Sequence, residues 1–273
     1  MPLTACRHVR KMRGGAQSHL LEADDGNYYV VKFQNNPQHR RILVNELVSA
    51  VFLKYLQISA AAAEIIRITP EFLVANPDVY IHLGTSRIPI QPGWHFGSRH
   101  PGNPDTLAIY DFVPDALLQR VSNLRDFLAV LVFDKWMSNA DGRQCVFFRA
   151  EIEEWQKPVS KAFVAVMIDH GFVFNGPNWA FIDSAPQGLY PRTLVYAGVR
   201  SLEDFQPWLD QIMYFPDSVV DQAFRQVPPE WLEGEEDEFE RLLESLLQRR
   251  RRVPDLLGAS RQSRANPFPN WTG

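Results

Sequence analysis

The sequence predicts a two-lobed α+β fold, with a small β-rich lobe first and a larger, mainly helical lobe after it. Short β-prone runs fill the first third of the chain, and helical spacing of apolar residues dominates from residue 123 onward. Such an order favours a ligand site between the lobes. We place the first lobe at residues 1–112, the helical lobe at 113–253, and a mobile Ser-, Arg-, Asn- and Pro-rich tail at 254–273.

Composition is that of a globular protein with a sizeable core. The 273 residues are 45% hydrophobic and 22% charged, and the net charge of −4 gives no reason to expect a nucleic-acid partner. The two cysteines, Cys6 and Cys145, are too few for a disulfide framework or a metal cluster. We see neither an apolar signal region nor an apolar run long enough for a membrane span, so we expect a cytoplasmic protein.

The first lobe begins with a hairpin and a helix. The strand patterns at His19–Ala23 and 28–33 flank Asp24-Asp25-Gly26-Asn27, a strong hairpin signal, and helical spacing follows over 38–56. Further strands are predicted at 64–69 and 79–83, and residues 91–105 have the composition of a loop. Within this loop, Trp94-His95-Phe96 either stacks on a ligand or caps the core.

The second lobe contains two short strands among helices. A helix is predicted from Asn123 to about residue 136, β-prone runs at 145–148 and 163–168, and further helices at 202–213, 217–226 and 235–252.

A glycine-rich turn precedes the hairpin. Gly14, Gly15 and Gln17 lie just before it, and glycines let backbone N–H groups approach phosphates. The alternative is a plain turn. No Gly-Lys-Ser/Thr follows, so this is not a Walker A loop.

Lys32 and Glu46 follow in an order that suggests an ion pair. Lys32 lies in the strand after the glycines, and Glu46 borders the apolar face of the next helix. A lysine held by such a glutamate is the arrangement that protein kinases use to bind phosphates. The alternative is that both are ordinary surface charges.

Two aspartates follow apolar segments in the second lobe. Asp141 lies where the helix from Asn123 ends, a position suited to accepting a proton, although Asn139, Asp141 and Gly142 also fit a simple helix-ending turn. Asp169 ends an apolar strand before His170-Gly171, which suits a Mg²⁺-binding carboxylate, and His170 is interpreted as a turn residue.

In order and spacing, these motifs resemble those of the HipA-like kinases, over about residues 10–215. The segments that carry the resemblance are Gly15-Ala16-Gln17, Lys32, Asn139-Ala140-Asp141 and Ile168-Asp169-His170-Gly171. The resemblance implies a protein-kinase-like fold that uses ATP and Mg²⁺. Lys32 would contact phosphates, Asp141 would be the catalytic base, Asp169 would hold Mg²⁺, and residues 111–114 would form the hinge near the adenine.

The sequence departs from the family pattern at several positions. The metal-binding asparagine expected after the catalytic acid is replaced by Gln144-Cys145-Val146; Gln144 offers a carbonyl oxygen, whereas Cys145 is too soft a ligand for Mg²⁺ and suits a small buried site. His19 stands where the family often has lysine, and Met12-Arg13 where longer relatives carry a phosphorylated serine. We expect a short, single-domain form without the extra N-terminal subdomain.

Three functions follow from the resemblance and its departures. The leading hypothesis is transfer of phosphate from ATP to a protein Ser/Thr hydroxyl. The alternatives are a small-molecule kinase and a pseudokinase that binds nucleotide or a partner without turnover. The acceptor is not identified by the sequence.

Overall fold

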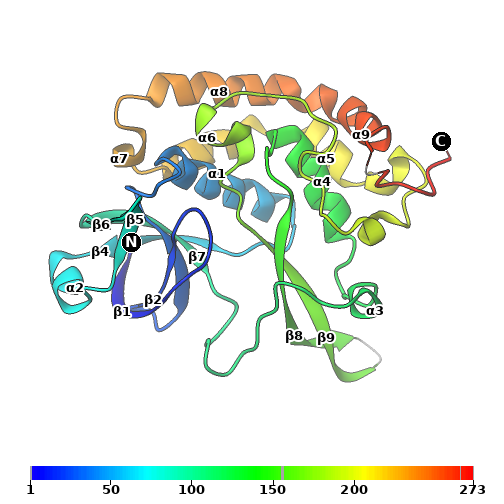
Figure 1. Ribbon diagram of the computed structural model, residues 1–273. Coiled ribbons are helices and arrows are strands. Elements are labelled where there is room, and N and C mark those ends of the chain that lie inside the picture. The colour runs from blue at the N-terminus through cyan, green and yellow to red at the C-terminus, as the bar shows by residue number, and fades with distance from the viewer. Residues whose placement is uncertain (1, 155–156, 265, 273) are drawn as a thin grey trace.

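A β-barrel formed by the N-terminal strands lies beside a helical layer formed by the later part of the chain (Figure 1). This computed structural model describes residues 2–154, 157–264 and 266–272. Its mixed α+β character, with strands first and helices last, confirms the predicted fold class. In the described part of the chain, no helix combines the length and the apolar character that a membrane crossing needs.

The barrel closes through its first strand. Its strands follow the order β1-β2-β3-β7-β4, and β1 runs antiparallel to β2 but parallel to β4. The hairpin β5–β6 and the short helix α2 lie outside this barrel order. The bounds are β1 Leu3–Lys11, β2 His19–Ala23, β3 Tyr28–Lys32, β4 Ala63–Ile68, α2 Pro70–Ala75, β5 Tyr80–Leu83, β6 Ser86–Pro89 and β7 Gly93–Arg99.

Two strands of the barrel are absent from the sequence prediction. β1 is rich in charged residues and two irregularities interrupt its pairing with β2, so it lacks a clean alternation of apolar and polar residues. The prediction of a loop over 91–105 is wrong for β7, which pairs on both sides, with β3 and with β4. Position 97 of this strand is a glycine because the Cβ of any other residue would lie 2.5 Å from the Ile66 side chain.

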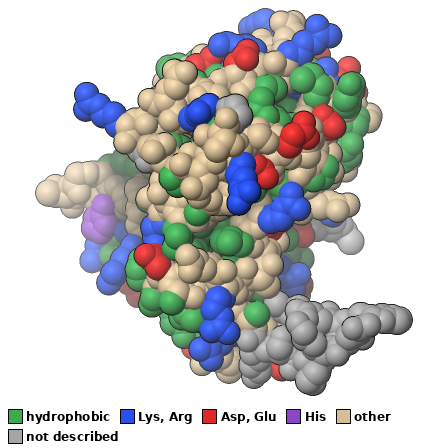
Figure 2. All heavy atoms as spheres, turned by 90° about the vertical axis from the view of Figure 1, so that its right-hand side faces the viewer, with side chains coloured by type: hydrophobic (Ala, Val, Ile, Leu, Met, Phe, Trp, Pro, Cys, Tyr) green, Lys and Arg blue, Asp and Glu red, His purple; other side chains and the backbone are tan. Residues whose placement is uncertain are grey.

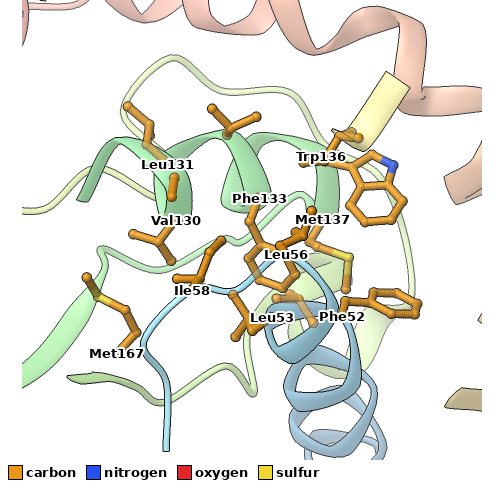
Figure 3. Close-up of a cluster of buried hydrophobic side chains, with 14 of the residues drawn as sticks. Phe52, Leu53, Leu56, Ile58, Val130, Leu131, Phe133, Trp136, Met137 and Met167 are labelled. Atoms are coloured by element: carbon orange, nitrogen blue, oxygen red, sulfur yellow. The ribbon is translucent and has the colours of Figure 1, made fainter. Parts of the chain in front are cut away.

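Helix α1 (Arg41–Tyr55) belongs to the helical core although it is encoded between barrel strands. Its apolar residues pack against α4 (Asp126–Met137) and Met167, as Figure 3 shows for Phe52, Leu53, Leu56 and their neighbours. The rings of Phe52 and Trp136 lie 5.5 Å apart. A second, separate apolar cluster fills the barrel. Burial of both clusters drives the assembly of the fold.

Of the remaining helices, α5, α8 and α9 pack on α4, whereas α6 and α7 pack on α1. Their bounds are α3 Asp115–Leu118, α5 Trp208–Met213, α6 Asp217–Gln226, α7 Pro229–Leu232, α8 Glu236–Arg249 and α9 Val253–Arg261. The structure therefore differs from the prediction of a mobile tail over 254–273. Leu257 of α9 is fully buried and Phe268 is 2% exposed, because both pack into the helical core.

A long ribbon, β8 (Gln144–Glu154) and β9 (Lys157–Ile168), projects beside the barrel (Figure 1). Its two strands are antiparallel, with Gln144 opposite Ile168 and Cys145 opposite Met167. Tyr110 and Phe147 exchange two backbone hydrogen bonds of 2.8 Å, which attach the connection between the two parts of the chain to this ribbon.

Candidate active site

Lys32, Glu46 and Asp169 meet in one ion-paired cluster. The Nζ atom of Lys32 contacts Oε1 of Glu46 and lies 2.7 Å from Oδ1 of Asp169. The predicted Lys32–Glu46 ion pair is therefore present. The side chains of Lys32 and Glu46 are 9% and 3% exposed, whereas that of Asp169 is 35% exposed, so the aspartate forms the accessible side of the cluster.

Burial and charge act in opposite directions on these groups. Burial alone lowers the pKa of Lys32, but the two carboxylates outweigh it and raise that pKa above its usual value. Burial raises the pKa of Glu46, and the neighbouring Asp169 adds to this. For Asp169, burial is outweighed by Lys32 and then Arg143, and the pKa falls below its usual value. Asp169 is thus held ionised, as a cation-binding carboxylate must be.

Local backbone structure positions each member of the cluster. Lys32 is the last residue of β3, and Glu46 lies on α1 one turn after Ile42. Asp169 follows β9 with a φ of 59°, a left-handed conformation that aspartate tolerates better than most residues. The chain therefore turns sharply at the aspartate.

The loop that carries Asp141 begins with another left-handed residue. Ser138 ends α4 with a φ of 52°. Asn139 then accepts a hydrogen bond from the Asp141 backbone N–H (3.1 Å), and the Asp141 carbonyl oxygen accepts one from Gly188 (3.0 Å). Asp141 is exposed, although these hydrogen bonds hold the loop backbone in place. This leaves the carboxylate accessible to a substrate.

Backbone hydrogen bonds join the Asp141 loop to the segment that follows Asp169. The Ala140 N–H donates to the Phe172 carbonyl oxygen (2.9 Å), and the Asn175 N–H donates to that of Ser138 (3.1 Å). The structure thus connects the two loops that carry the predicted catalytic and metal-binding aspartates.

A buried ion pair beneath these loops is missing from the sequence prediction. Arg143 and Asp134 form a two-pronged pair, and both side chains are fully buried. Arg143 also donates to the Ile168 carbonyl oxygen (3.0 Å) and to Nδ1 of His170 (2.9 Å). Asp134 accepts a further hydrogen bond from Asn139 (2.9 Å). The available signal was an aspartate within the apolar run of α4, since a buried charge needs a partner.

Gln144 and Cys145 point to opposite faces of the β8–β9 ribbon. Gln144 is exposed and pairs with Ile168, the residue before Asp169. Cys145 is 6% exposed and part of the apolar core, and burial raises the pKa of its thiol to about 11. The interpretation of Cys145 as a small buried residue is confirmed. Within the described residues, no three His, Cys, Asp or Glu side chains converge to hold a metal on their own.

The glycine-rich turn connects β1 to β2. Gly14 has a φ of 123°, which favours glycine, and nothing lies close to the place of its missing Cβ. The Gln17 side chain is used internally: its amide donates to the His82 carbonyl oxygen and accepts from the His82 N–H, both at 2.7 Å. Gln17 therefore anchors the turn to β5, and its side chain is not free to contact a phosphate. His19 is fully buried, and burial lowers its pKa to about 4.

The predicted hinge, residues 111–114, is held by Arg192. This guanidinium contacts the Val113 carbonyl oxygen and the Asp115 carboxylate, and lies 4.5 Å from the Phe112 ring centre. In the segment Trp94-His95-Phe96, His95 and Phe96 are 1% and 2% exposed. Those two residues therefore cap the core.

An open groove of about 770 Å³ lies apart from this cluster. It is lined by α1, α6, the linker 57–62 and the start of β4, and Lys32, Glu46, Asp141 and Asp169 are not among its lining residues. We assign the chemistry by the ion-paired residues, since a groove by itself supplies no reacting group.

The fold and this cluster define a phosphotransferase of the protein-kinase-like class. The chain belongs to the HipA-like kinases, because the model of that family matches residues 7–178. Among solved structures, it is similar to a Golgi casein kinase with Mn/ADP bound (TM-score 0.52, 11% identity, 97% of this chain and 74% of that one). A second structure of the Golgi casein kinase gives a TM-score of 0.51 at 13% identity, with the same coverage. No curated protein matches the chain.

Proposed function

We propose that this HipA-like kinase transfers phosphate from ATP to a Ser/Thr hydroxyl of a protein, with Mg²⁺ as the metal. The observation that carries the proposal is the contact of Lys32 with both Glu46 and Asp169. A lysine fixed by a buried glutamate, beside an accessible aspartate, is the arrangement that phosphate and metal binding require. The Golgi casein kinase with Mn/ADP bound, which shares the fold, supports the use of nucleotide and a divalent metal.

In this proposal, each residue has a distinct role. Lys32 binds nucleotide phosphates, and the Gly14-Gly15 turn supplies backbone N–H groups above them. Asp169 and the Gln144 carbonyl oxygen are the Mg²⁺ ligands, and both offer the oxygen atoms that Mg²⁺ prefers. The metal, when bound, neutralises charge that develops on the phosphates. Asp141 accepts the proton of the attacking hydroxyl, whose oxygen forms the new bond to phosphorus as the bond to ADP breaks.

Mg-ATP turnover, followed by intact-mass analysis of the protein and of candidate acceptors, tests the proposal. Asp141→Asn keeps shape and removes the proton acceptor, so phosphoryl transfer should fall about 10²–10⁴-fold while Mg-ATP binding stays within a few fold. Asp105→Asn, at another exposed aspartate, is the matched control and should retain activity. Equal activity in wild type and Asp141→Asn would remove Asp141 as the base.

Binding measurements separate the pseudokinase alternative. Saturating Mg-ATP should raise the melting temperature of the wild type by mass action, and Lys32→Ala should weaken this shift. By calorimetry, Asp169→Ala should lose more Mg-ATP affinity than Gln144→Ala, because only the carboxylate carries charge. Binding without transfer to any acceptor would favour a pseudokinase, and absence of a thermal shift would refute nucleotide binding.

A further inference from the structure

Asn45 is a fully buried polar residue on α1 that no predicted role uses. Its Nδ2 atom donates to the carbonyl oxygens of Gly171 (2.7 Å), Val173 (3.1 Å) and Gly176 (3.0 Å). Its Oδ1 atom accepts a hydrogen bond from Nε1 of Trp179 (2.9 Å). A buried amide is costly unless its polar atoms are bonded, and here both the donor and the acceptor have partners.

The groups that Asn45 binds lie in an irregular segment. Phe174, Asn175 and Gly176 have positive φ values of 56°, 57° and 65°. Such a segment cannot satisfy its own carbonyl groups as a regular helix does, so these oxygens need partners from elsewhere. Asn45 supplies one donor group to three of them.

The position of Asn45 connects two site carboxylates. It directly precedes Glu46 on α1, and the first carbonyl that it binds, that of Gly171, lies two residues after Asp169. Both carboxylates contact Lys32. The Asn45 hydrogen bonds therefore fix the spacing of the two groups that hold the lysine.

Close packing strengthens the same junction. A Cβ at Gly171 would lie 2.5 Å from Cγ2 of Ile42, so α1 packs directly on the backbone there. Arg41 donates to the Pro177 carbonyl oxygen (3.0 Å), and its guanidinium lies 4.1 Å from the ring centre of Trp179. The segment 171–179 is thus held against the first half of α1 along its length.

We propose that Asn45 is a positioning residue, which joins α1 to the segment 171–179 so that Glu46 and Asp169 are placed together before nucleotide and metal bind. Its catalytic consequence rests on the proposed function. Without the amide, the backbone that follows Asp169 is less firmly held, so this carboxylate would be less well placed to bind a metal. Changing a group that orients a metal ligand typically alters metal affinity about 10–100-fold, so the Mg²⁺ requirement is the sensitive quantity.

The experiment compares Asn45→Ala with Asn123→Ala, in the full-length chain. Asn123, in the turn before α4, is the control because its side chain also bonds a distant backbone, donating to the Ala165 carbonyl oxygen (2.8 Å) and accepting from the Ala165 N–H (2.9 Å). Hydrogen–deuterium exchange without nucleotide should be about tenfold faster or more over residues 170–178 in Asn45→Ala, and unchanged there in Asn123→Ala. The Mg²⁺ concentration for half-maximal phosphoryl transfer should rise about tenfold in Asn45→Ala alone.

The outcomes are distinguishable. If Asn45→Ala exchanges hydrogen over 170–178 no faster than the wild type, the proposal is overturned. It is also overturned if the Mg²⁺ concentration for half-maximal transfer rises equally in Asn45→Ala and Asn123→Ala, because that would show a merely structural role. If the wild type transfers no phosphate, the proposed function fails, while the exchange comparison still decides whether Asn45 positions the segment. If Asn45→Ala does not fold, Trp179→Phe removes the bond to Oδ1 and also reduces the ring contacts with Arg41 and Phe239. It leaves the three Nδ2 bonds in place, so it should give a smaller increase in exchange over the same residues; no increase would refute the proposal.

Discussion

Removing Arg143 while leaving Asp134 in place should strongly destabilise the protein. Both side chains of this ion pair are fully buried, so Arg143→Met leaves a carboxylate in the core without its counter-charge. Breaking a buried pair in this way costs about 3–5 kcal/mol. That is a large part of the roughly 5–15 kcal/mol by which most domains are stable, and the lost hydrogen bond to Ile168 acts in the same direction.

Urea unfolding of a double-mutant cycle measures this cost. Asp134→Asn removes the uncompensated charge, so Asp134→Asn/Arg143→Met should be more stable than Arg143→Met alone, with a coupling energy of about 1–3 kcal/mol. The control is Arg7→Met, because Arg7 pairs with Glu22 on the surface and its side chain is 54% exposed; solvent screens this pair, so the change should leave the free energy of unfolding nearly unaltered. The reasoning would be refuted if the two single changes in unfolding free energy added strictly to that of the double variant. It would also be refuted if Arg143→Met lost no more unfolding free energy than Arg7→Met.

Two further stability predictions follow from other buried positions. Gly171→Ala should cost about 1–3 kcal/mol in urea unfolding, because its Cβ would lie 2.5 Å from Ile42, whereas Gly198→Ala, with nothing within 4 Å, should stay within about 0.5 kcal/mol; equal losses would contradict the packing argument. Burial lowers the pKa of Lys135 from its ordinary value of 10.5 to about 8. Between these two pH values the unfolded state binds more protons than the folded state, so the free energy of unfolding rises with pH. The free energy of unfolding of wild type relative to Lys135→Met should therefore increase by about 2 kcal/mol from pH 7.5 to 9.5, and a flat difference would argue against a perturbed lysine.

The parts predictable from sequence are those with a local signal. The hairpin around Asp24-Asp25-Gly26-Asn27 and the helix that carries Glu46 show turn chemistry and apolar periodicity, so both were found. The Lys32–Glu46 pair was also predictable, because the order of strand and helix carries that information. The direct contact of Asp169 with Lys32 joins residues far apart in the sequence and was not predicted; the resemblance to a family implied only that both residues serve the same ATP and Mg²⁺ site.

The parts that were missed depend on tertiary contacts. Glycines and prolines in and around β7 give it the composition of a loop, but its pairing with β3 on one side and β4 on the other makes it a strand. Gln17 suited a phosphate-binding turn, yet its side chain bonds to His82, which no local pattern indicates. The segment that contains α9 and Phe268 has the composition of a tail, but its apolar side chains are buried in the helical core. In each case the long-range contact outweighs the local preference.

Figure 2 shows acidic and basic side chains interspersed with apolar ones on the face at the right of Figure 1. Among the described residues visible there, no continuous basic stripe of the kind that nucleic-acid binding uses is apparent. This face is consistent with the near-neutral net charge of −4. Interspersed charges of both signs also limit repulsion within the folded protein.

Closure of the barrel has a practical consequence for how the protein is handled. Among the described residues, two pairs join β1 to β4, Leu3 with Ile66 and Thr4 with Arg67, so closure of the ring depends on the start of β1. Trimming residues 2–4 would open it and leave part of β4 with unpaired backbone groups, and a bare strand edge is a template for intermolecular pairing. Shortening at the N-terminus should therefore promote aggregation.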